Sequence, residues 1–81
     1  MIQIIYKPWV YKQLKKLPLA EKKKIIKKLE LLAKSPQSGK KLEGKLKDFY
    51  SLRAWPYRII YALEKSQIMI YSVVHRQSAY R

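Results

Sequence analysis

The stretches YRIIYAL (residues 57–63) and QIMIYSVV (residues 67–74) decide the fold of this chain. Each is a short run rich in β-branched and aromatic residues, which is typical of a β-strand. Only three residues separate the two runs, so we expect them to pair as an antiparallel hairpin. A similar run over about residues 49–54 precedes them and is joined to them by Trp55-Pro56. Together the three runs predict an antiparallel meander.

The N-terminal half has the pattern of a strand followed by two helices. Residues 2–6 form a short β-branched run, and Pro8 suits the first turn of a helix that continues to Leu17. A second helix is predicted over residues 20–34, where apolar side chains recur at helical spacing and lysines occupy the other arc. The short link between the helices favours an antiparallel hairpin. Residues 36–48 hold both glycines and four lysines, and they are predicted to form a loop.

These elements predict a fold class. We expect one α+β domain over residues 1–81, with an N-terminal strand and a two-helix antiparallel hairpin packed on one face of a mainly antiparallel sheet of about four strands. The middle strand is largely apolar on both faces, and the helices can cover only one of them. The other face is therefore either a shallow groove or a docking surface for a partner.

The charge of the chain restricts its partners. It has 19 basic and 5 acidic residues, which give a net charge of +14. A small domain with this charge repels itself, and nucleic acid is the commonest partner that offsets such a cost. An acidic protein and an anionic membrane surface are the alternatives. There is no cysteine, and no apolar run approaches the roughly 20 residues of a membrane span. A cytoplasmic protein fits these features.

Basic side chains stand at the ends of the predicted strands. A hairpin brings Arg53, near the end of one strand, close to Arg58 at the start of the next. Arg76 follows the third strand, whose end lies beside the start of the second, and Tyr80 can fold back over both. Guanidinium groups gathered on one sheet face are costly unless an anion binds there. The alternative is that they form solvated ion pairs, but the chain has only five acidic residues to supply partners.

The remaining candidate residues allow two interpretations each. His75 is the only histidine, so it cannot build a metal site here; it is either a proton carrier or a satisfied residue at a strand end. Trp55 is difficult to bury in a tight turn and is a candidate contact for a base or a protein. Four lysines are candidate phosphate-binding residues or simply a solvated surface: Lys23, Lys27, Lys45 and Lys47.

Several motifs, in this order and spacing, resemble the RelE/ParE superfamily of small toxins from bacterial and archaeal toxin–antitoxin pairs. The motifs are KLEG (41–44), YSLR (50–53), YRIIY (57–61) and HRxxxY (75–80), and the resemblance covers nearly the whole chain. It implies a compact fold of two helices on an antiparallel sheet. It also implies an acidic antitoxin that wraps the basic toxin, and no cofactor or metal.

The resemblance implies two activities. Members similar to RelE enter the ribosomal A site and cut messenger RNA, and their arginines match Arg53, Arg58 and Arg76, with a tyrosine at Tyr80. Members similar to ParE bind DNA gyrase and cut nothing. RelE has lysines where this chain has Phe49 and Ser51, a departure that favours the ParE-like alternative. A basic binding module without toxicity is the third possibility.

The RelE-like activity would be attack of a ribose 2′-OH on the adjacent phosphate. Arg58 and Arg76 suit stabilisation of the charged phosphorus intermediate, because guanidinium groups match phosphate oxygens and stay charged. Tyr80 or His75 would transfer protons. The ribosome would hold the message in the reactive geometry, which alone can contribute about 7–11 kcal/mol. We therefore expect an endoribonuclease that cuts free RNA poorly.

Overall fold

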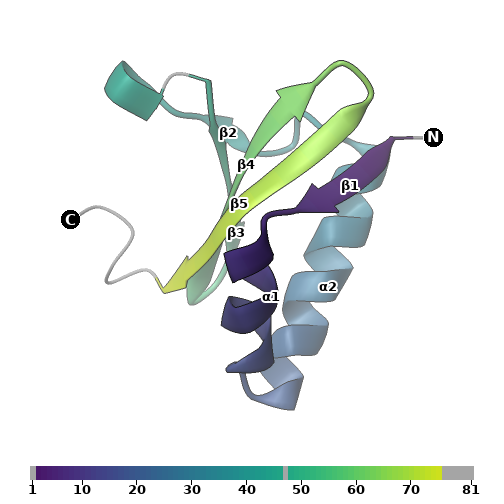
Figure 1. Cartoon of the computed structure of the whole chain (residues 1–81), viewed down its shortest axis with the longest axis vertical. Helices are drawn as coiled ribbons and strands as arrows, with labels where there is room; N and C mark the ends of the chain where they lie inside the picture. Colours follow the sequence, from purple (N-terminus) through teal and green to yellow (C-terminus); the bar gives the residue numbers. More distant parts are fainter. Residues whose placement is uncertain (1, 47, 76–81) are drawn as a thin grey trace.

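A computed structural model describes residues 2–46 and 48–75 as two helices on a five-stranded sheet (Figure 1). The elements in chain order are β1 (Gln3–Tyr6), α1 (Pro8–Lys15), α2 (Leu19–Lys34), β2 (Lys40–Lys41), the short 3-10 helix η1 (Gly44–Leu46), β3 (Tyr50–Ala54), β4 (Tyr57–Glu64) and β5 (Gln67–His75). The predicted α+β class and the order of its main elements are confirmed.

The sheet is mixed, with the strand order β1-β5-β4-β3-β2. β3, β4 and β5 form the predicted antiparallel meander, and β1 lies parallel to β5 at one edge. The expected number of about four strands was one too few. Lys40 and Lys41, predicted to lie in a loop, pair with β3 as the edge strand β2. A strand of two residues has no period of its own, so only tertiary pairing reveals it.

The two helices begin and end close to the predicted residues. Pro8 occupies the start of α1, where its missing N–H costs nothing. α1 ends at Lys15, two residues before the predicted end, and a tightened turn follows in which the Leu17 amide donates to the Leu14 carbonyl over 3.1 Å. Pro18 explains this early end, because it disfavours helical geometry in the residue before it. No helix in the described part of the chain is long and apolar enough to cross a membrane.

The core lies between the two helices and the face of the sheet that they cover in Figure 1. Its fully buried members come from α1, α2, β4 and β5; the largest are Tyr61, Ile25, Leu32, Ile59, Ile68, Ile70 and Val10. We call the sheet surface that carries these residues the helix face and the opposite surface the open face. Side chains alternate between the two along each strand, so the register decides which residues can share a site.

β5 contains a bulge that moves side chains between the faces. The pairing with β4 shifts between Ile60 and Tyr61, which leaves Tyr71 as the extra residue of β5. α1 supplies the hydrogen bonds that this irregular backbone needs. Trp9 Nε1 donates to the Tyr71 carbonyl over 2.6 Å, and the amide of Val73 donates to Gln13 Oε1 over 2.9 Å. The bulge is therefore held by the helix packed beneath it.

Candidate nucleic-acid interface

The open face carries a pair of arginines at the end of the sheet next to the β3–β4 turn. Arg53 and Arg58 are direct partners in the antiparallel register, which places both side chains on the same face. Their neighbours Ala54 and Tyr57 belong to the helix face, where both pack against the core. The predicted proximity of Arg53 and Arg58 is therefore confirmed. Two like charges directly opposite each other destabilise a sheet, and a bound phosphate would reverse that effect.

An exposed tryptophan extends this arginine pair. The guanidinium carbon of Arg53 lies 4.9 Å from the centre of the Trp55 ring, within the range of a cation–π contact. The turn that carries Trp55 is tied to α2, because Lys24 Nζ donates to the Trp55 carbonyl over 3.0 Å. The same ammonium group contacts Glu21 Oε2 at 3.3 Å. Residues distant in sequence thus fix the position of the turn.

His75 does not share the face of the arginine pair. It pairs with Tyr57, whereas Arg58 pairs with Val74, so His75 belongs to the helix face. Its ring meets the Tyr57 ring edge to face, with 5.5 Å between centroids and an interplanar angle of 87°. The predicted role of His75 as a proton carrier beside Arg58 is not supported, because alternation along the strand places it on the opposite face. In this arrangement the imidazole packs against an aromatic ring.

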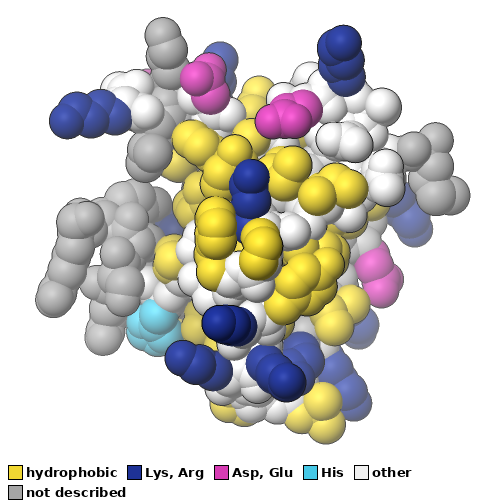
Figure 2. All heavy atoms as spheres, in the orientation of Figure 1, with side chains coloured by type: hydrophobic (Ala, Val, Ile, Leu, Met, Phe, Trp, Pro, Cys, Tyr) yellow, Lys and Arg dark blue, Asp and Glu magenta, His cyan; other side chains and the backbone are white. Residues whose placement is uncertain are grey.

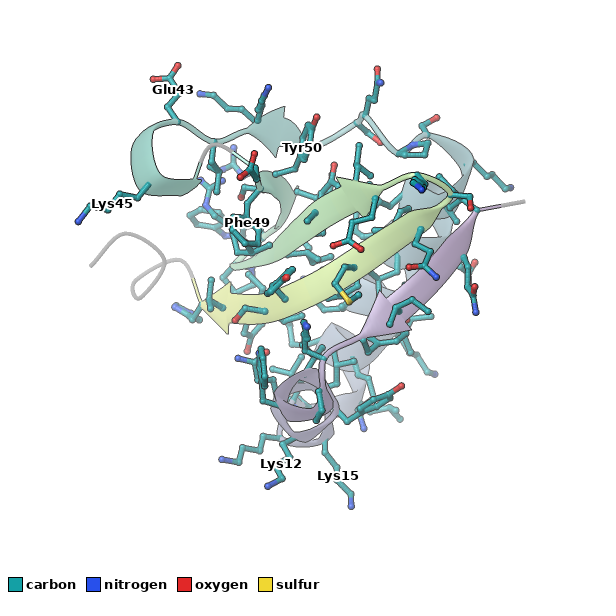
Figure 3. All side chains as sticks on the ribbon, turned by 45° about the horizontal axis from the view of Figure 1, so that its top comes forward. Lys12, Lys15, Glu43, Lys45, Phe49 and Tyr50 are labelled. Carbon is teal, nitrogen blue, oxygen red and sulfur yellow. The ribbon has the colours of Figure 1, made fainter. Side chains whose placement is uncertain are left out.

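The two strand positions where RelE has lysines hold side chains that pack. Phe49 is half-buried and meets the Tyr71 ring edge to face at 4.7 Å, and Figure 3 shows it between η1 and the sheet. Ser51, on the face of Arg53, is buried, and its hydroxyl has no hydrogen-bond partner within the described ranges. Neither side chain can replace a lysine in proton transfer. The site differs from a RelE-like one at these positions.

The candidate lysines are spread over the molecule. Lys45 projects from η1 away from the sheet in Figure 3, on the side opposite the helices. Lys23 and Lys27 are exposed on α2, the helix from which Lys24 reaches the Trp55 carbonyl. Figure 2 shows lysine and arginine side chains at the top, centre and bottom of the view, with acidic groups only near the top and at the right edge. The structure therefore shows a broad basic field and not one cluster.

Three of the candidate residues, Lys47, Arg76 and Tyr80, lie outside the described residues. Over the ranges 2–46 and 48–75, no three His, Cys, Asp or Glu side chains gather as a possible metal site.

The other end of the sheet has a separate structural feature around Tyr61. Its hydroxyl donates to the Pro36 carbonyl and accepts from the Gly39 amide, each over 3.0 Å. Its ring stacks on Tyr50 with 5.3 Å between centroids. Burial raises the pKa of Tyr61, and the hydrogen bond from Gly39 partly opposes that effect. A cavity of about 620 Å³ nearby, lined in part by Ile2 and Leu63, lies toward the end of β4 opposite Arg58.

Sequence reasoning missed the side chains that position this interface. Gln13, Trp9 and Lys24 each bind backbone groups of the sheet or its turn from a helix. Their partners lie between 31 and 62 residues away in the sequence. The only sequence signal for these contacts was a polar or amphipathic residue on an otherwise apolar side of a helix. That signal does not identify the group that the side chain binds.

Comparison with known families places the whole chain in one group. A family model described as the ParE toxin of type II toxin–antitoxin system, parDE, matches residues 4–80. A search of curated proteins gave no match.

Solved structures of toxins have the same fold. The RelBE2 toxin–antitoxin complex from Mycobacterium tuberculosis matches with a TM-score of 0.85 and 24% identity, over 93% of this chain and 98% of that one. The archaeal RelE–RelB complex from Pyrococcus horikoshii matches with a TM-score of 0.79 and 26% identity, over 96% and 98%. The isolated Escherichia coli RelE toxin matches with a TM-score of 0.77 and 26% identity, over 93% and 84%.

Proposed function

Because this chain belongs to the RelE/ParE family of toxins from type II toxin–antitoxin systems, we propose that it halts translation by cutting messenger RNA on the ribosome. The observation that carries this proposal is the direct pairing of Arg53 with Arg58 on the open face. A gyrase-binding protein does not need two guanidinium groups on one sheet face, whereas a ribonuclease that stabilises a phosphorus intermediate can use both.

The roles of the residues follow from their chemistry. Arg58 stabilises the charge that develops on the phosphate during attack by the neighbouring 2′-OH, and Arg53 binds the adjoining backbone. We assign Arg76 as a further phosphate ligand and Tyr80 as the residue that handles protons or stacks on a base. We assign His75 no role in proton transfer at the arginine pair, because the strand register puts it on the helix face. The ribosome supplies much of the positioning.

The partners follow from the charge. A net charge of +14 suits an acidic antitoxin, and two of the matched structures are complexes of RelE-family toxins with their antitoxins. We propose that a cognate acidic antitoxin neutralises this chain and that its target is messenger RNA in the ribosomal A site.

The proposal is tested by primer extension on a message translated in a cell extract. Arg58→Ala lowers the cleavage rate at least about 10²-fold, as expected for a lost donor to the transition state, and Arg76→Ala does the same. Lys15→Ala is the matched control, because Lys15 points away from α1 into solvent (Figure 3). Cleavage at the wild-type rate by the Arg58→Ala variant would overturn the assignment.

A second candidate is a non-enzymatic inhibitor of DNA gyrase. Two observations favour it: the matched family model is described as the ParE toxin, and Phe49 and Ser51 provide no proton-transfer group. A supercoiling assay with purified gyrase separates the two candidates. Inhibited supercoiling with intact messages supports the gyrase inhibitor, and cut messages with normal supercoiling support the ribonuclease.

A further inference from the structure

Trp55 places a large aromatic side chain in solvent next to the arginine pair. It lies in the turn between β3 and β4, and 47% of its surface is exposed. The exposed part of the indole ring contributes no burial energy to folding, because it remains in water. About half of this side chain is therefore accessible to a ligand.

The ring is held in place before any ligand binds. Arg53 lies over it at 4.9 Å, and the carbonyl of Trp55 accepts the hydrogen bond from Lys24 on α2. An aromatic ring fixed by a guanidinium group and a tethered backbone loses little conformational freedom when a flat ligand stacks on it. The arrangement is that of a preorganised stacking surface.

The neighbouring charges indicate which flat ligand fits. Arg53 joins the two features, because it contacts Trp55 and also pairs with Arg58. Proteins that bind single-stranded nucleic acid combine cationic groups for the backbone with aromatic rings for the bases. We propose that Trp55 stacks on an unpaired base of the RNA whose phosphate is bound by Arg53 and Arg58. This inference rests on the proposed function for the identity of the ligand as RNA.

The other tryptophan of the chain provides an internal contrast. Trp9 is 50% exposed, but its ring nitrogen donates to the carbonyl of Tyr71 and its position is explained by support of the bulge. With two tryptophans in the sequence, Trp9→Phe leaves Trp55 as the only indole fluorophore. Circular dichroism and thermal unfolding first verify that this background folds like the wild type.

The test uses a short single-stranded 2′-O-methyl RNA, which cannot be cut by attack of a 2′-OH. Binding quenches Trp55 fluorescence in the Trp9→Phe background. Fluorescence anisotropy of an end-labelled RNA gives the affinities of variants that lack this indole. Trp55→Ala weakens binding by about 5- to 150-fold, the range for one base stacked on an aromatic side chain, and Trp55→Phe retains most of the affinity. The dependence of affinity on salt does not change, because no charge is removed.

An oligonucleotide of the same length with abasic positions is the matched ligand. It carries the same phosphates without bases, so it binds the wild type more weakly than the complete RNA does. It binds the wild type and Trp55→Ala equally. Equal affinity of the wild type for both oligonucleotides, or wild-type affinity in the Trp55→Ala variant, overturns the inference. A protein contact at Trp55 would give that result.

The outcomes separate this inference from the proposed function. If Arg58→Gln weakens RNA binding and Trp55→Ala does not, the stacking role is wrong and the phosphate site stands. If the chain cuts no message on the ribosome but shows base-dependent quenching, the nuclease activity is wrong and the stacking role stands.

Discussion

At the scale of single residues, the arginine pair is where stability and binding conflict. Two like charges facing each other across neighbouring strands destabilise the sheet by about 0.2–1 kcal/mol. The contact of Arg53 with Trp55 stabilises it by about 0.5–1 kcal/mol. These effects nearly cancel, so Arg53→Gln changes the free energy of unfolding by less than about 0.5 kcal/mol. Its effect on anion binding is larger. Inorganic phosphate raises the Tm of the wild type more than that of Arg53→Gln, because a ligand stabilises only the state that binds it.

The measurement is thermal unfolding at increasing phosphate concentration and constant ionic strength. Lys15→Gln removes one exposed charge at the end of α1, outside the strands that carry the pair, and is the control for the general effect of charge. The anion site is disproved if phosphate raises the Tm of all three proteins equally.

Tyr61 is the residue that fixes the loop between α2 and β2. Tyr61→Phe leaves the Gly39 amide and the Pro36 carbonyl without their partner, which costs about 1–3 kcal/mol in the free energy of unfolding. Tyr11→Phe, at an exposed position, changes it by less than about 0.5 kcal/mol. Urea unfolding of both variants at neutral pH gives the comparison. Equal losses in the free energy of unfolding would contradict the role of Tyr61 in fixing the loop.

The stabilisation that the Tyr61 hydroxyl provides depends on pH. The pKa of Tyr61 is raised in the folded state above its ordinary value of 10.0, so the unfolded chain loses this proton first. The contribution of Tyr61 is therefore complete below pH 10 and is lost as pH rises from there through the folded pKa. The difference in stability between the wild type and Tyr61→Phe shrinks over that interval. A constant difference would mean that the hydroxyl titrates alike in both states.

At the scale of elements, α1 and the bulge of β5 form one unit. Gln13 accepts from the Val73 amide and donates to the Ser72 hydroxyl over 3.1 Å. Gln13→Leu leaves the amide unsatisfied and lowers the free energy of unfolding by about 1–3 kcal/mol. Gln13→Glu keeps the acceptor and loses less. Lys12→Leu, on the solvent side of α1 in Figure 3, is the control, and urea unfolding is the measurement. Equal losses in the Leu and Glu variants would show that the acceptor oxygen is unimportant.

This unit also marks how far the sequence predicts the structure. The strands β3 to β5 and both helices follow from local patterns, and the pairing of Arg53 with Arg58 follows from a short turn. The face of His75 depends on the register beside the bulge, and the contacts of Gln13 and Lys24 depend on tertiary packing. Hydrophobic periodicity and secondary-structure propensity contain no information on those contacts.

At the scale of the whole molecule, the charge is distributed over two sides of the sheet. The arginine pair lies on the open face, and Lys23 and Lys27 lie on α2, which packs against the helix face. RNA bound at the arginines therefore releases counterions mainly from the open face. For single strands, each phosphate contact contributes about 0.7 to the slope of log K against log salt concentration.

A pair of double variants tests whether the lysines of α2 take part in RNA binding. Arg53→Gln with Arg58→Gln reduces the magnitude of the salt slope for single-stranded RNA by about 1.4, the effect of two lost contacts. Lys23→Gln with Lys27→Gln removes the same charge but reduces the slope by less, because these lysines lie on α2 and we assign the phosphate contacts to the arginine pair on the open face. Fluorescence titrations between low and moderate salt give both slopes. An equal reduction in the two double variants would require RNA to contact α2 as well, and the interface would then extend around both sides of the sheet.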